Sequence, residues 1–200
     1  MEAIVAILAG GRSTRMGRSK ATVELAGRPL ISYPIEAARA VGLEPWVIAK
    51  RDSELPTLDC RVLTEPDQPS HPLCGIVTAL HATAPWPVLA VAADMPFVED
   101  KLMAWLASQL STTAVEAAGR LQPLLARYDT ADVDALEEAL AQGVPARDAV
   151  RDLDPMIVGE ADLGRFGDPR ILTFNVNTPD DLREADRILA ARAALPRAEG

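Results

Sequence analysis

The sequence predicts an α/β fold, a Rossmann-like three-layer α/β/α sandwich whose central sheet is mostly parallel with a small antiparallel excursion. Short apolar runs alternate with segments of helical periodicity, and the first run, residues 3–8, is continuously apolar, as in a central strand buried on both faces. Such βα units connect through right-handed crossovers and place a ligand at the carboxyl ends of their strands.

The first half of the chain supplies the parallel units. In the segment 31–41 apolar residues recur at helical spacing, and Gly42 stands where a C-terminal cap is expected. The predicted strands of this half are residues 3–8, 45–49, 61–63 and 87–92, and the predicted helices are residues 31–41 and 76–82.

The second half is patterned differently. Two extended runs, residues 112–118 and 121–128, predict the antiparallel excursion, and a final strand is predicted over residues 171–174. Thr178 is expected to cap the last helix and Pro179 to begin it. The predicted helices of this half are residues 102–110, 133–141, 145–152 and 180–193. The acidic side chains of the helix over residues 133–141 are assigned to solvation alone.

Length and composition bound the classes of protein that remain. Two hundred residues, 48% of them hydrophobic, suit one domain, which we expect over residues 1–195, with residues 196–200 as a frayed tail. A net charge of −9 without a long basic face predicts no nucleic-acid partner. The two cysteines, Cys60 and Cys74, lack the spacing of a zinc site or disulfide framework.

The chain opens directly on an apolar strand. It shows neither a charged leader nor an apolar run near the ~18 residues that a membrane-spanning helix needs. We therefore expect no membrane partner and a cytoplasmic location.

The first predicted strand leads into a loop, residues 8–20, that is rich in glycine and in basic side chains. Glycine lets successive backbone N–H groups approach a phosphate chain, and a basic island in a chain of net charge −9 indicates a local anionic ligand. The glycines are Gly10, Gly11 and Gly17, and the cations are Arg12, Arg15, Arg18 and Lys20.

The spacing in this loop differs from two common phosphate-binding motifs. Five residues separate Gly11 from Gly17, and the lysine, Lys20, stands three positions after Gly17. The P-loop instead has four residues between its two glycines and a lysine directly after the second. The dinucleotide motif G-x-G-x-x-G is not met either, because Gly10 and Gly11 are adjacent. A glycine-rich βα turn without a ligand remains the alternative.

The loop resembles the signature L-A-G-G-x-S/T-x-R-M-G-x-x-K of nucleotidyltransferases that bind a nucleoside triphosphate. It is most similar to the signature of molybdenum cofactor guanylyltransferases. The resemblance implies that GTP, as co-substrate, is bound by Leu8, Ala9, Gly10, Gly11 and Lys20, and that Arg15 and Lys20 act in catalysis.

Asp94 follows the buried strand predicted over residues 87–92, and Pro96 ends that strand. A carboxylate at the mouth of the sheet suits Mg²⁺ shared with triphosphate oxygens, although a lone aspartate in this place is equally explained as a helix cap. The string Ala93-Asp94-Met95-Pro96 resembles the metal-binding D-M/T-P turn of the family. The resemblance implies that Asp94 is catalytic and binds both Mg²⁺ and nucleotide.

Asp67 lies in the turn that follows the third predicted strand. Turn hydrogen bonding alone explains an aspartate there, whereas the resemblance implies a nucleotide contact. The next motif, His71-Pro72-Leu73-Cys74-Gly75, is similar to the family's G/H-P-L-x-G. Family members commonly carry glycine before this proline, so His71 leaves the loop geometry open and receives no role. A nucleotide-contacting Asn that follows the second strand in some relatives has no match near Lys50 and stays unassigned.

Two further strings resemble motifs from the acceptor side of the family's site. Residues 119–124 are similar to G-x-x-Q/H-P-L, and residues 175–179 are similar to N-V-N-T-P. The resemblance implies acceptor-side roles for Gln122, Pro123, Asn175 and Asn177. Alternation along a strand end would direct both asparagine amides to one cleft, while a turn or cap role explains one of them without a ligand.

The resemblance implies transfer of GMP from GTP to the terminal phosphate of molybdopterin or the molybdenum cofactor, with Mg²⁺ and with transient contacts to cofactor-biosynthesis proteins or molybdoenzymes. The alternatives are a cytidylyltransferase or sugar-phosphate nucleotidyltransferase of the same fold, or a non-catalytic GTP-binding relative. Cytidylyltransferase relatives tend to carry L-A-A-G where this chain has Leu8-Ala9-Gly10-Gly11, so we attribute the guanine preference to Gly11.

Overall fold

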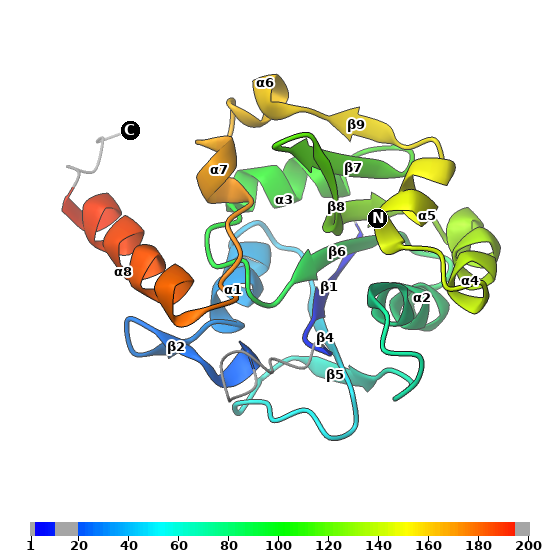
Figure 1. Cartoon of the computed structure of the whole chain (residues 1–200), viewed down its shortest axis with the longest axis horizontal. Coiled ribbons are helices and arrows are strands. Elements are labelled where there is room, and N and C mark those ends of the chain that lie inside the picture. Colours follow the sequence, from blue (N-terminus) through cyan, green and yellow to red (C-terminus); the bar gives the residue numbers. More distant parts are fainter. Residues whose placement is uncertain (1–2, 11–19, 195–200) are drawn as a thin grey trace.

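A computed structural model describes residues 3–10 and 20–194 and shows a mostly parallel central sheet, as predicted (Figure 1). Its seven strands follow the order β5-β4-β1-β6-β8-β7-β9. The strands are β1 (Ile4–Leu8), β4 (Pro45–Ala49), β5 (Arg61–Thr64), β6 (Val88–Ala92), β7 (Thr113–Ala117), β8 (Arg120–Tyr128) and β9 (Met156–Val158).

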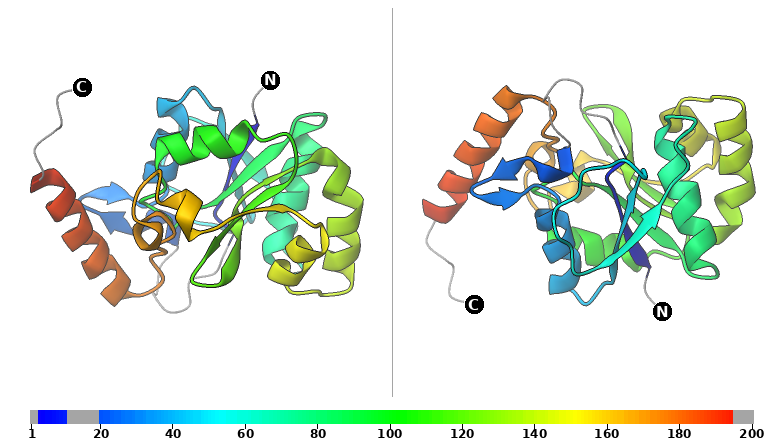
Figure 2. Two further views of the ribbon diagram at one scale, coloured as in Figure 1. Left: turned by 90° about the horizontal axis from the view of Figure 1, so that it is seen from above. Right: turned by 90° about the horizontal axis from the view of Figure 1, so that it is seen from below.

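Helices cover both faces of the sheet, which confirms the three-layer sandwich (Figure 2). One face packs on α1 (Ser32–Ala40) and α3 (Asp100–Ala107), and the other on α2 (Pro72–Thr83), α4 (Val133–Ala141) and α5 (Ala146–Asp152). The alternation of a strand explains this directly: Val5 and Ile7 of β1 belong to the first core, whereas Ala6 between them belongs to the second.

The predicted antiparallel excursion is a hairpin that continues the main sheet. Strand β8 lies between β6 and β7 and is antiparallel to both. The register between β7 and β8 shifts after Ala114. Ala114 is paired with Ala126, but the next residue of β7, Val115, is paired with Gln122. Pro123 lies inside this bulge, where it removes a ladder donor, and its carbonyl accepts a 2.7 Å hydrogen bond from the hydroxyl of the buried Tyr128.

A small two-stranded sheet, β2 (Glu24–Leu25) and β3 (Arg28–Pro29), was not predicted, because strands of two residues carry no periodic signal. It forms a separate apolar cluster with the last helix, α8 (Pro179–Ala194), through Leu25 and Ala185. Helix α8 begins as predicted: the Thr178 hydroxyl accepts a hydrogen bond of 3.2 Å from the Asp181 N–H. The remaining short helices are η1 (Lys20–Thr22), η2 (Thr130–Asp132) and α6 (Glu160–Leu163).

The strand predicted over residues 171–174 is wrong, because the chain forms α7 (Pro169–Leu172) at that point. The Asp168 carboxylate accepts a 2.9 Å hydrogen bond from the Arg170 N–H, and Pro169 occupies the first helical position. Both are helix-start signals that outweigh a short apolar run. Residues 173–177 consequently approach the site as irregular chain and not as a strand end.

Three other expectations concern the surface and the chain ends. Within the described residues no helix has the length and apolar character to cross a membrane. The predicted tail, residues 196–200, lies outside the described part of the chain. The assignment of the α4 acids to solvation alone is wrong for Glu137, whose carboxylate lies 2.7 Å from the ring nitrogen Nε2 of His81 on α2.

Candidate active site

The parallel strands β1, β4, β5 and β6 end at one edge of the sheet, beside a cavity of about 350 Å³ that we call the nucleotide cavity. Hydrogen bonding continues past the strand ends: Ala9 N–H donates to Ile48 O at 2.8 Å, and Ala93 N–H donates to Leu8 O at 3.1 Å. The cavity is lined by Leu8, Ala9, Gly10, Lys50, Glu65, Ser70, His71, Pro72, Gly75, Ala92, Ala93, Asp94 and Leu124.

Part of the predicted nucleotide-binding set is found at this cavity. Leu8, Ala9, Gly10 and Asp94 all line it. Gly11 and Arg15 lie outside the described residues, and of Lys20 only the backbone is described, at the start of η1. The roles of these three residues stay predictions, and so do those of the four residues at the cavity, for which the structure gives the position alone.

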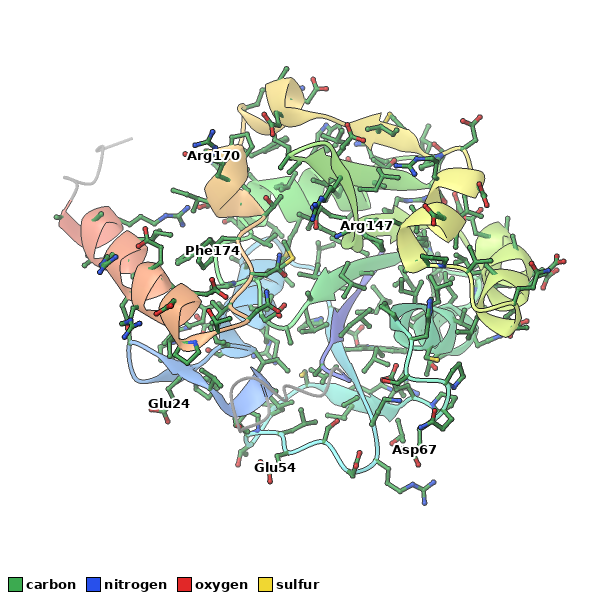
Figure 3. The ribbon with its side chains drawn as sticks, in the orientation of Figure 1. Glu24, Glu54, Asp67, Arg147, Arg170 and Phe174 are labelled. Atoms are coloured by element: carbon green, nitrogen blue, oxygen red, sulfur yellow. The ribbon has the colours of Figure 1, made fainter. Side chains whose placement is uncertain are left out.

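The structure does not bring the Asp67 side chain to the nucleotide cavity. Asp67 is exposed, and Figure 3 shows it at the edge of the molecule. The carboxylate that lines the cavity from this segment is that of Glu65, the first residue after β5. The sequence could have indicated Glu65, because a residue directly after a parallel strand lies at the edge of the sheet where ligands bind.

The Glu65 carboxylate lies between two glycines. A Cβ atom on Gly10 would lie only 1.8 Å from Glu65 Oε1, and a Cβ atom on Gly75 would lie 3.0 Å from Glu65 Oε2. Glu65 is 7% exposed, and this burial raises its pKa while the charge of Lys50 lowers it. A side chain at position 10 is therefore incompatible with this place of the carboxylate, and one at position 75 would crowd it.

The attribution of nucleotide preference to Gly11 needs a correction of one position. The strings L-A-G-G and L-A-A-G differ at the third residue, which is Gly10 in this chain. The side-chain space of Gly10 is filled by the Glu65 carboxylate, so an alanine in this position would displace it. Among the described residues of the loop, Gly10 is thus one whose missing side chain affects the shape of the cavity.

Lys50 follows β4, at the position left unassigned above, and it lines the nucleotide cavity at 8% exposure. Its ammonium donates to the carbonyl of Pro66 at 3.1 Å and to that of Asp67 at 2.7 Å. A buried ammonium requires such acceptors, because the loss of hydration is otherwise costly. Lys50 therefore connects the end of β4 to the segment that carries Glu65.

The departure at His71 has a structural explanation. The Nδ1 atom of His71 accepts a 3.2 Å hydrogen bond from the Leu73 N–H, so the imidazole caps the first turn of α2. Pro72 begins the helix at the position where a missing N–H costs nothing. This role positions the loop and requires no proton transfer by His71.

Asp94 lies two residues beyond β6, is 8% exposed, and lines the nucleotide cavity. Its backbone carbonyl accepts a 2.9 Å hydrogen bond from the Val176 N–H, which brings the segment of Asn175 and Asn177 to this turn. Within residues 3–10 and 20–194 no group of three or more His, Cys, Asp or Glu side chains is placed to hold a metal ion. A single carboxylate still fits Mg²⁺, which commonly combines one or two carboxylates with substrate phosphates.

A second cavity, of about 600 Å³, adjoins the first and is called here the acceptor cavity. The two share Pro72 and Leu124 as lining residues. All four residues predicted for the acceptor side line it, together with residues of α5 and its preceding loop that the sequence did not indicate. The lining is Pro72, Met95, Gln122, Pro123, Leu124, Pro145, Ala146, Arg147, Asp148, Asn175 and Asn177.

The asparagines reach the acceptor cavity from irregular chain held by local hydrogen bonds. The Asn175 amide donates to Thr173 O at 2.9 Å, and the Asn177 N–H donates to the Asp181 carboxylate at 2.9 Å. Figure 3 shows Arg147, on α5, nearer the middle of the molecule than Asp67. Arg147 is exposed, so its guanidinium is a cation available to an anionic ligand in this cavity.

Comparison with known proteins agrees with this geometry. Residues 5–156 match the family described as "MobA-like NTP transferase domain". The chain belongs to this family. A relative from Pelotomaculum thermopropionicum, named "Probable molybdenum cofactor guanylyltransferase", is 33% identical over 98% of this chain and 98% of its own length.

Solved structures show the same fold as this MobA-like chain. Molybdopterin-guanine dinucleotide biosynthesis protein A from Archaeoglobus fulgidus is 25% identical, with a TM-score of 0.77 over 94% of this chain and 98% of its own. The 2-C-methyl-D-erythritol 4-phosphate cytidylyltransferase from Thermus thermophilus is 22% identical, with a TM-score of 0.68 over 95% of this chain and 100% of its own. Proteins named for guanine and for cytidine nucleotides therefore share this fold, so the fold alone does not indicate which nucleotide this chain binds.

Proposed function

We propose that the chain transfers GMP from GTP to the terminal phosphate of molybdopterin, or of its molybdenum-bearing form, and releases pyrophosphate. The names of its full-length relatives support this assignment. So does the presence of two adjoining cavities, one lined by Leu8, Ala9, Gly10 and Asp94 and the other by the four residues predicted for the acceptor side.

The observation that carries the guanine assignment is the Glu65 carboxylate between Gly10 and Gly75. The Watson–Crick edge of guanine presents two neighbouring donors, N1–H and N2–H₂, and an ionised carboxylate offers two acceptor oxygens. Cytosine presents a single donor, N4–H₂, and acceptors at N3 and O2 on the corresponding edge. A carboxylate that faces two neighbouring positions of this edge therefore favours guanine and disfavours cytosine, whose N3 and O2 it repels.

The same observation weighs against a cytidylyltransferase. In an L-A-A-G loop, alanine would replace Gly10, and its methyl group would lie only 1.8 Å from Glu65 Oε1. The carboxylate acceptor would have to leave, together with its repulsion of cytosine. Gly10 and Glu65 thus form a pair that is consistent with guanine and not with cytosine.

For the reacting phosphates we propose that Asp94 holds Mg²⁺ and that Arg15 and Lys20 bind the triphosphate, with Asp67 near the nucleotide only through its backbone. When bound, Mg²⁺ supplies charge neutralisation for the triphosphate oxygens. The burial of Asp94 at the end of β6 supports this, since a fixed carboxylate beside the nucleotide cavity requires no reorganisation.

The transfer itself needs positioning more than proton transfer. A terminal phosphate oxygen of the acceptor attacks the α-phosphorus of GTP, the bond from that phosphorus to the bridging oxygen breaks, and pyrophosphate leaves with the electron pair. A phosphate monoester has a second pKa near ~6 and is largely dianionic at neutral pH, so no general base is required. The two adjoining cavities would supply the alignment.

On the acceptor side we propose that Gln122, Asn175 and Asn177 bind the pterin end of the acceptor and that Arg147 binds its phosphate. Amides donate and accept hydrogen bonds, as a pterin ring requires, and guanidinium matches the oxygens of a phosphate. Pro123 contributes through the bulge that aims Gln122 into the cavity. The cytoplasmic location, the single domain and the transient protein partners stay predictions.

The assay that tests the proposal measures pyrophosphate release with molybdopterin as acceptor and GTP, CTP or ATP as donor, at saturating Mg²⁺. We expect turnover with GTP at least about tenfold above either rival, the effect of one or two hydrogen bonds to the base. Equal rates with the three nucleotides would overturn the guanine assignment. Absence of turnover with GTP and molybdopterin would overturn the transfer.

A further inference from the structure

Lys50 is a buried cation at the nucleotide cavity, and none of the family motifs matched above assigns it a role. The chain contains three lysines, Lys20, Lys50 and Lys101, alongside seventeen arginines. Lys50 is 8% exposed although a lysine side chain is almost never fully buried unless it is paired. Within the described residues its ammonium donates hydrogen bonds to the carbonyls of Pro66 and Asp67, and its charge acts on Glu65, which precedes them.

Backbone pairing fixes the start of this segment but not its continuation. Strand β5 pairs with β4 as far as Thr64 opposite Ala49, and the Glu65 N–H donates to Ala49 O at 2.9 Å. Beyond this point Pro66 has no N–H to donate, so the chain leaves the ladder. The Lys50 ammonium takes over there, with bonds to the next two carbonyls.

The charge of Lys50 acts on Glu65 as well as on the chain that follows it. Glu65 is buried between Gly10 and Gly75, where its ionised form is disfavoured, and Lys50 is the described group whose charge opposes that cost. Asp94, His71 and Cys74 are the other titratable groups that the described residues place at or beside this end of the cavity. Among Lys50, Asp94, His71 and Cys74, Lys50 is the group that brings a positive charge to Glu65.

We propose that Lys50 is a positioning residue for nucleotide selection, holding residues 65–67 so that the Glu65 carboxylate stays beside Gly10 and meets the N1–H and N2–H₂ donors of guanine. This inference rests on the proposed guanine specificity of the cavity. It adds that the selectivity for guanine depends on Lys50, which directly follows β4 and acts through Glu65.

The test compares GTP with inosine triphosphate, which lacks only the N2 amino group. For the wild-type enzyme we expect GTP to bind at least about tenfold more tightly, because a site built for that amine leaves an acceptor unpaired without it. In Lys50→Met the ratio should fall to within about twofold, with the KM for GTP raised and kcat at saturating GTP within about twofold of wild type.

Matched variants separate this role from a general effect on folding. Lys50→Arg keeps charge and donors and should retain most of the selectivity, whereas Lys101→Met, on the exposed Lys101 of α3, should change nothing. Lys50→Gln, which keeps one donor, provides an intermediate if Lys50→Met does not fold. A double variant with Glu65→Gln should show no further loss of selectivity, because both changes act on one contact.

The outcomes distinguish the inference from the function beneath it. If the wild-type enzyme itself fails to prefer GTP over inosine triphosphate, the proposed contact of Glu65 with the N2 amine fails. If the wild type prefers GTP and the folded Lys50→Met and Lys50→Gln enzymes keep the same ratio, the positioning role is overturned. Additive losses in the double variant would overturn action through Glu65.

Discussion

The nucleotide cavity and the acceptor cavity lie side by side but are assembled in different ways. The first is lined by residues at or directly after the ends of β1, β4, β5 and β6 of the parallel sheet, together with the start of α2 and Leu124 of β8. The second is lined by a bulge in β8, the start of α5 and irregular chain before α8. If the proposed assignment of the cavities holds, the regular half binds the nucleotide donor and the irregular half binds the acceptor.

The largest expected effect comes from removing the carboxylate of Asp94, the residue at which the lining of the nucleotide cavity contacts the chain before α8. Asp94→Asn keeps the shape and the backbone carbonyl that bonds Val176 but loses the charge. We expect turnover to fall roughly 10²- to 10³-fold, the scale of losing one electrostatic contact to the reacting phosphates, with little change in melting temperature. A paired melt and pyrophosphate-release assay at saturating Mg²⁺ measures both.

The control for Asp94→Asn is Asp162→Asn, which changes an exposed aspartate on α6. Turnover there should stay at the wild-type level. If Asp94→Asn also turned over normally, the metal role would be abandoned in favour of a structural one. A large drop in melting temperature with normal activity per folded molecule would argue the same way.

Gly10→Ala tests the donor half alone. The new methyl group meets Glu65 Oε1, so the carboxylate must move, and the KM for GTP should rise about tenfold or more while the KM for the acceptor stays constant. Steady-state kinetics with each substrate varied in turn measures the two constants. Adding Glu65→Ala should relieve the clash without restoring preference for GTP over CTP; restored preference would mean that Glu65 does not select the base.

Arg147→Met tests the acceptor half alone. Loss of an exposed guanidinium beside an anionic acceptor should raise the acceptor KM about three- to tenfold, with the GTP KM unchanged. Arg170→Met is the matched control, since Figure 3 shows Arg170 on α7, well away from Arg147. Parallel changes in both KM values would show that the two cavities are not independent.

The smallest expected effect concerns stability and pH. Burial raises the pKa of Glu65 above its unfolded value, so the folded state binds the proton more tightly, and wild-type stability falls as pH rises from below about 4.3 through the folded pKa. Glu65→Gln removes this loss. Its melting temperature relative to wild type should therefore increase between pH 4 and pH 7; a constant difference across that range would contradict the assignment.

The sequence predicted the regular half well for a physical reason. Buried parallel strands are continuous apolar runs, and β4 and α4 were predicted with the bounds that the structure gives. Leu8, Ala9, Gly10 and Asp94 lie at or just after the ends of such runs and line the cavity. Glu65 was missed because the resemblance to the family assigned the nucleotide contact to Asp67, two residues further along the chain.

The irregular half could not be predicted from local patterns. Gln122, Pro123, Asn175 and Asn177 were indicated only by resemblance to family motifs, and Arg147 carried no local signal at all. Their meeting depends on the register shift in β8 and on the bond from Val176 to the Asp94 turn, which join segments distant in the chain. The helix α7, in place of a strand, was decided by Asp168 and Pro169 against an ambiguous apolar run.

On the ribosome the residues that line the two cavities emerge at different times. The lining of the nucleotide cavity lies between Leu8 and Leu124, whereas the acceptor cavity and the bond from Val176 to Asp94 require the segment that ends at Asn177. Domains generally fold as units during synthesis. A nascent chain that stops before Asn175 is therefore expected to lack both the full lining of the acceptor cavity and the bond that joins it to the Asp94 turn.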